Sequence, residues 1–123
     1  MTLKRALKHL AERDPRFSFY EGGYRNGGTV KWIPTHDLPP RITSISSIDF
    51  YSAMSIAHMI GGEFQTLRAD YDRQVVRQYW MAEWWMMEEQ AIHQCGMGYE
   101  TVEDATAAAL TEIILCAYPK KAK

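Results

Sequence analysis

The sequence predicts an α+β fold that is mainly helical, with about four helices and one β-hairpin in the N-terminal half. Apolar residues recur at helical spacing near the N-terminus and after residue 46, whereas residues 17–33 contain two aromatic and β-branched runs. No Gly or Pro interrupts the chain from Glu63 to Cys95, which favours helix over that length. The 123 residues are expected to form a single domain, residues 1–123.

The first helix is predicted over residues 1–14, where five apolar residues share one face. These residues are Leu3, Ala6, Leu7, Leu10 and Ala11. Thr2 is a suitable N-cap residue, and Asp14-Pro15 is expected to end the helix because the residue before a proline avoids helical geometry.

A β-hairpin is predicted over residues 17–33, because Asn26-Gly27 readily adopts the positive φ angles of a type I′ turn. Tyr24 and Arg25 then lie near its tip. Residues 34–41 contain three prolines and are expected to form a stiff connector to the rest of the domain.

Residues 46–118 are predicted to be the helical part. Ser46 and Asp49 have the spacing of a capping box for a helix that ends at Gly61-Gly62. Residues 63–95 are predicted to form one long helix, because apolar residues recur every three or four positions. The alternative breaks this segment near residues 68–72 and makes residues 74–85 a strand, since Val, Tyr and Trp favour strands.

A last helix is predicted from Thr101, which has capping-box spacing to Asp104, as far as Pro119. It contains few polar residues and should therefore lie deep in the domain. Residues 119–123 form a short basic tail.

The sequence YWMAEWWMMEE, residues 79–89, contains three Trp and three Met. As a helix or as a strand, it presents apolar side chains on two opposite sides. A helix over residues 64–95 would be about 48 Å long, whereas a domain of this length has a diameter of roughly 35 Å. The end that carries the tryptophans would therefore project, be clasped by a second copy, or break.

Three interpretations follow: these rings belong to the core, they contact another protein or a second copy of the chain, or they stack on nucleic-acid bases, which the neighbouring glutamates disfavour because they repel phosphate. The second interpretation gives the predicted partner-binding residues. They are Trp80, Met81, Trp84, Trp85 and Glu88, with Tyr24 and Arg25 of the hairpin.

The distribution of charge argues against general DNA binding. Residues 1–41 carry eight Lys/Arg and four Asp/Glu, whereas residues 42–118 carry three and eleven. A DNA-binding protein concentrates positive charge over one face, so direct nucleic-acid binding is not expected. Glu83, Glu88 and Glu89 interrupt the most apolar segment, so no membrane span is expected, and the chain is predicted to be cytosolic.

The sequence lacks recognisable enzyme motifs, so no enzymatic activity, cofactor or metal is predicted. Two cysteines without CxxC spacing are expected to be free thiols. One alternative is a metal-dependent hydrolase that uses Glu89 and His93, which are four residues apart. Another is a nucleic-acid binder that uses the Tyr24-Arg25 hairpin and the terminal lysines.

The sequences SSIDFYSAMSIAHMI and GYETVEDATAAALTEIILCAY, with the aromatic segment between them, resemble small phage and prophage accessory proteins of the ABA-sandwich type. The resemblance covers about the last two thirds of the chain. It implies a phage-type binding role, such as interference with a host defence complex by an anti-CRISPR-like protein. The function expected is therefore inhibition by steric occupation of a protein partner.

Overall fold

The computed structural model describes residues 2–22, 27–34, 38–71 and 77–120. Its first part consists of α1 (Leu3–Arg13), β1 (Phe17–Tyr20), β2 (Thr29–Trp32), β3 (Arg41–Ser44), the 3₁₀ turn η2 (Ile45–Ser47) and α2 (Phe50–Met59). Its second part consists of β4 (Gly62–Tyr71), β5 (Arg77–Met86), β6 (His93–Tyr99) and α3 (Val102–Ala117).

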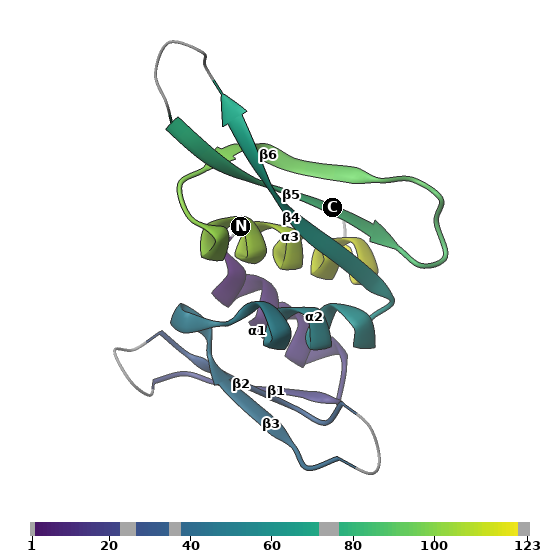
Figure 1. Cartoon of the computed structure of the whole chain (residues 1–123). Helices are drawn as coiled ribbons and strands as arrows, with labels where there is room; N and C mark the ends of the chain where they lie inside the picture. Colours follow the sequence, from purple (N-terminus) through teal and green to yellow (C-terminus); the bar gives the residue numbers. More distant parts are fainter. Residues whose placement is uncertain (1, 23–26, 35–37, 72–76, 121–123) are drawn as a thin grey trace.

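The helices lie between two antiparallel sheets (Figure 1). The first sheet has the strand order β1-β2-β3, and the second sheet has the order β4-β5-β6. Helix α3 packs against all three strands of the second sheet on one side and against α1 and α2 on the other. The hydrophobic core therefore runs through the middle of the molecule, around α3.

The prediction of a mainly helical fold with four helices and one hairpin is wrong. Residues 63–95 do not form a helix; they contribute β4, β5 and β6, so the described chain has three α-helices and two three-stranded sheets. The physical reason is that a segment with apolar side chains in two opposite directions also fits a strand, because alternate side chains of a strand point to opposite faces of the sheet. Pairing β4 with β5 folds the segment back on itself, and a ten-residue strand of about 34 Å is shorter than the roughly 48 Å of one helix and covers α3.

Where β4 and β5 pair near α3, their described residues bury alternate side chains. Phe64, Ala82 and Trp84 are buried against α3, whereas their neighbours along each strand point the other way. Gly62 allows the start of β4 to approach α3 closely, because a Cβ atom at this position would lie 2.5 Å from Ile113 Cγ2.

The first sheet forms where the hairpin is predicted. β1 and β2 pair antiparallel, with Phe17 opposite Trp32. The chain then returns as β3, which pairs with β2. This strand begins at Arg41, the last residue of the predicted connector, and was not expected from the sequence. Trp32 is 1% exposed, and its Nε1 donates a hydrogen bond to Ser55 Oγ at 2.9 Å, which joins this sheet to α2.

Each helix begins at a side-chain cap. Thr2 Oγ1 accepts from the backbone N of Arg5, and Thr101 Oγ1 accepts from the backbone N of Asp104. For α2 the cap is Asp49, whose Oδ1 accepts from Ser52 N at 2.7 Å; the capping box expected from Ser46 is not formed. Among the described residues, no helix is long and apolar enough to cross a membrane.

Asp14 joins the end of α1 to the end of α3. Its carboxylate accepts from the Arg16 guanidinium, with Nη2 to Oδ2 at 2.7 Å, and from the Tyr118 hydroxyl at 2.8 Å. His9 Nε2 lies 2.7 Å from the carbonyl oxygen of Tyr118. Hydrogen bonds from Arg16, opposed by burial, lower the pKa of Asp14 from 3.8 to about 2.

Asp14→Asn should therefore reduce stability at neutral pH by about 1–2 kcal/mol, because Arg16 is half exposed and solvent screens part of the pairing energy. The folded-state pKa lies below the unfolded value. The stabilisation is thus present above pH 4 and is lost as the pH falls from 4 toward 2. Urea unfolding of both proteins at pH 6, 4 and 2.5 measures this difference, which should shrink at low pH. A difference that stays constant over this range would contradict the assignment.

Candidate functional site

The side of the second sheet that faces away from α3 is the surface most suited to a partner. We call it the outer face. Its described side chains are Glu63, Gln65, Leu67, Tyr79, Met81, Glu83, Trp85 and Gln94. The helices pack on the opposite side of this sheet, and among the described elements none packs extensively on the outer face (Figure 1).

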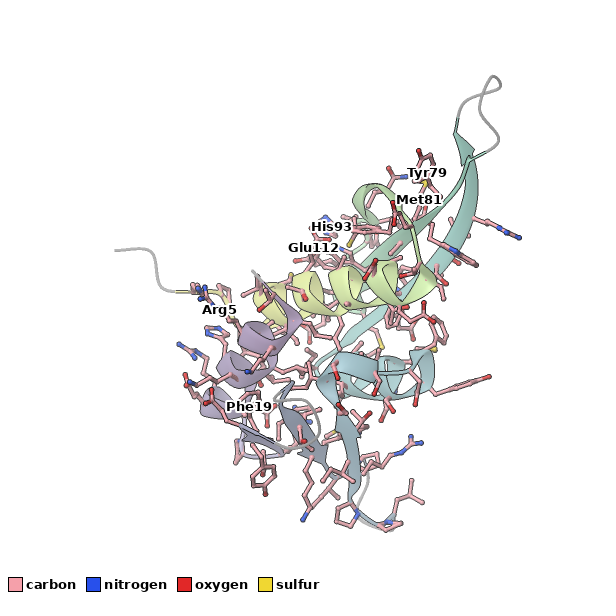
Figure 2. All side chains as sticks on the ribbon, turned by 90° about the vertical axis from the view of Figure 1, so that its left-hand side faces the viewer. Arg5, Phe19, Tyr79, Met81, His93 and Glu112 are labelled. Atoms are coloured by element: carbon pink, nitrogen blue, oxygen red, sulfur yellow. The ribbon has the colours of Figure 1, made fainter. Side chains whose placement is uncertain are left out.

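Large apolar side chains lie on this face, and no described helix or strand packs over them. Leu67 is 39% exposed and lies opposite Met81 across the β4–β5 pair. Met81 and Trp85 are half-buried. Figure 2 shows Met81 and Tyr79 near each other on the upper part of the second sheet, far from Arg5 and Phe19.

An acidic group occupies the middle of the outer face. Glu83 on β5 accepts a hydrogen bond from Gln65 Nε2 at 2.8 Å, and Gln94 Nε2 lies 3.5 Å from its other oxygen. These amides come from β4 and β6, so the carboxylate is held from both neighbouring strands. Glu63 lies directly opposite Trp85 in the same pair of strands.

The inner side of the same sheet has a different role. Trp84 is 6% exposed, and its Nε1 donates to Glu112 Oε2 on α3 at 2.8 Å. The Cys95 thiol donates to the same carboxylate oxygen. The imidazole of His93 stacks on the Trp84 ring, with centroids 4.2 Å apart and planes 20° apart. Figure 2 places His93 and Glu112 close together where the sheet meets α3.

The residues predicted to bind a partner are therefore divided between the two faces. Met81 and Trp85 lie on the outer face, whereas Trp80 and Trp84 point toward α3. Trp80 is half-buried, with the Arg68 guanidinium 5.7 Å from its ring centroid. Exposed Glu88 lies in the turn after β5.

Tyr24 and Arg25, predicted at the tip of the hairpin, lie outside the described residues. Leu67, Gln65 and Glu83 are not among the partner-binding residues predicted from the sequence. For Leu67 the available signal is the alternation of polar and apolar residues from Thr66 to Tyr71, which a helical spacing of apolar residues over the same segment hides.

The pair Glu89 and His93 does not lie on a helix. Glu89 follows the end of β5 and His93 begins β6, with 3.7 Å between Glu89 Oε2 and His93 Nε2. In the described part of the chain, no group of three or more His, Cys, Asp or Glu is placed to hold a metal ion.

The buried thiol lacks the environment of a nucleophile. Burial, followed by the adjacent Glu112 carboxylate, raises the pKa of Cys95 far above its usual value. Because the reactive species of cysteine is the thiolate, this arrangement suits a structural hydrogen-bond donor.

Comparison of the chain with protein-family models, curated proteins and solved structures finds no match. The assignment of a function therefore depends on the geometry and chemistry of the described residues.

The two neighbouring tryptophans should respond differently to truncation. Trp84→Ala opens a cavity and leaves Glu112 without its indole donor, so we expect a loss of about 3–5 kcal/mol in unfolding free energy. Trp85→Ala removes a half-buried ring from an uncovered face, and the expected loss is about 1 kcal/mol. Chemical denaturation compares the two variants. Equal losses would show that the assignment of faces is wrong.

The thiol of Cys95 should be protected in the folded protein. In a Cys116→Ser background, its reaction with a disulfide reagent at pH 8 should be slower than in the unfolded chain by about a hundredfold or more. Absorbance of the released thiol product gives the rate, and addition of denaturant should restore fast reaction. Fast reaction without denaturant would contradict the burial of this thiol.

Proposed function

We propose that this protein acts by binding, and that its outer face contacts a basic, partly apolar surface of another protein. The observation that carries the proposal is the uncovered outer face, where Leu67, Met81 and Trp85 surround an acidic centre. Large apolar side chains at such a surface gain free energy when a partner removes them from water.

The charge of the outer face supports a basic partner. Its described side chains include two carboxylates, Glu63 and Glu83, and no Lys or Arg. The Glu83 carboxylate is already held in place by the glutamine amides, so it needs little reorganisation to accept a charged hydrogen bond. Opposite charge on the partner would also accelerate the encounter.

Trp85 and Glu63 together suit an arginine or lysine side chain. They face each other across β4 and β5, so a cation placed over the indole ring would lie beside a carboxylate. A cation over an aromatic ring contributes about 0.5–1 kcal/mol at exposed sites.

A second copy of the same chain fits this face less well. Stacking two outer faces would bring Glu63 and Glu83 of one copy near the same residues of the other. Like charges at an interface oppose association, so the acidic centre favours a different, basic protein over self-association.

The size of the face indicates a modest interface. A ten-residue strand is about 34 Å long and three strands are about 14 Å wide. This gives roughly 480 Å² of flat area, which is below the roughly 800 Å² per partner of a standard stable interface. A basic segment or a small domain therefore suits the face better than a large obligate subunit.

Binding of this kind would produce inhibition if the basic surface of the partner normally holds nucleic acid. The acidic face would then occupy that surface and exclude the nucleic acid. The phage-type, anti-CRISPR-like role implied by the sequence resemblance is a specific form of this proposal, with a host defence complex as the partner.

The proposal is tested with an array of twelve-residue peptides that have constant apolar content and net charges from −4 to +4. We expect the wild-type protein to prefer positive peptides. Met81→Ser combined with Trp85→Ser should remove binding, and Glu63→Gln combined with Glu83→Gln should weaken it about tenfold. Dissociation constants from fluorescence anisotropy at fixed salt give the comparison.

The control is Ile42→Ser on the first sheet, which removes another exposed apolar side chain, 65% exposed, from a different surface. It should leave peptide binding unchanged. Binding without preference for positive charge, or binding that survives the Met81 and Trp85 substitutions in a folded protein, would overturn the proposal.

A further inference from the structure

A pocket of about 660 Å³ opens where α2, α3 and β5 all end. Figure 1 shows the C-terminal ends of α2 and α3 and the turn after β5 on the same side of the molecule. Pockets that bind small organic molecules typically have volumes of about 300–1,000 Å³. No residue of the outer face lines this pocket, so the ligand of the pocket is inferred independently of the partner proposed for the outer face.

The walls of the pocket combine polar groups with apolar side chains that contain sulfur. Met59, Met86 and Tyr118 line it and pack against the hydrophobic core behind them. Met87 also lines it and is 51% exposed. Methionine side chains are polarizable and adapt to ligands of irregular shape.

The rim of the pocket has an excess of negative charge. Its one described cationic side chain is Arg16, and Asp14 pairs with this guanidinium at 2.7 Å. The Arg16–Asp14 pair is neutral overall, which leaves the exposed carboxylates of Glu88 and Glu89.

The negative charge of Glu89 affects the pKa of a thiol in the pocket wall. Burial, and then the negative charge of Glu89, raise the pKa of the Cys116 thiol, which lines the pocket. The field of Glu89 therefore acts inside the pocket, where negative charge opposes formation of a thiolate and would favour a cation.

Two helix ends add to this potential. Helix α2 ends at Met59 with Ile60 as its C-cap, and α3 ends at Ala117 with Tyr118 as its C-cap. All four residues line the pocket. A helix C-terminus carries the negative end of the helix dipole, so both helices favour positive charge at this place.

We infer that this pocket binds a lipophilic organic cation, such as a quaternary ammonium or phosphonium ion with aromatic or alkyl substituents. The apolar substituents would contact Met59 and Met86, and the positive centre would lie near the Tyr118 ring and the carboxylates of Glu88 and Glu89. Aromatic rings and carboxylates together are a common way to hold a cation that cannot donate hydrogen bonds.

The test uses two probes of nearly identical shape and opposite charge, tetraphenylphosphonium and tetraphenylborate, with the full chain at 150 mM NaCl. Equilibrium dialysis or calorimetry should show saturable binding of the phosphonium ion and binding of the borate that is weaker by tenfold or more. Glu88→Gln combined with Glu89→Gln should weaken phosphonium binding about tenfold, because two carboxylates near the cation are removed.

A matched control removes the same charge far from the pocket. Glu100→Gln combined with Glu103→Gln lies at the opposite end of α3, and the 16 residues of this helix span about 24 Å. This variant should bind the phosphonium ion like the wild type. To locate the site, Ala117→Trp should fill the pocket and abolish binding while the unfolding temperature stays near the wild-type value.

Equal affinity for both probes would overturn the inference. It would also be overturned if the Glu88/Glu89 variant and a folded Ala117→Trp variant both retained phosphonium binding. If Ala117→Trp fails to fold, the charge comparison of the two double variants decides the question alone. The peptide experiment on the outer face does not bear on this outcome, because none of its substituted residues lines the pocket.

Discussion

Helix α3 is apolar around much of its circumference, so it has to be covered from more than one direction. Its buried residues are Ala105, Thr106, Ala109, Leu110, Thr111, Ile113 and Ile114. The second sheet covers one side, and α1 and α2 cover the other. Those two helices are covered in turn by the first sheet, whereas none of the described elements forms a layer beyond the second sheet (Figure 1). The surface available for a partner therefore follows from how the chain buries its last helix.

Polar contacts fix the position of α3 among these layers. Glu112 accepts from Trp84 and Cys95 on two strands of the second sheet, and Tyr118 reaches Asp14 at the end of α1. Apolar packing alone would tolerate a helix that slides or rotates, but buried donors have to meet their acceptors. Tyr118, which makes the contact with Asp14, also lines the pocket.

The sequence was informative about the starts of α1 and α3 and about the first two strands, whereas it placed the cap of α2 at Ser46 instead of Asp49. Thr2 and Thr101 cap helices as predicted, and the paired runs around Asn26-Gly27 coincide with β1 and β2. It failed for residues 63–95, because apolar residues on both sides of a segment satisfy helix and strand equally. Only packing on α3 distinguishes them. Of the predicted partner-binding residues, Trp85 and Met81 lie on the outer face, whereas neighbouring Trp84 lies on the inner side of the sheet. The reason is that successive side chains of a strand point to opposite faces.

The order of elements along the chain has a consequence for synthesis. Every element that encloses α3 is translated before it, and the inner residues Ala82 and Trp84 of β5 are buried against α3. A nascent chain that has reached Tyr99 therefore displays an unfilled trough in its second sheet. The core is completed only when the final helix emerges, and apolar surface exposed before that point promotes aggregation.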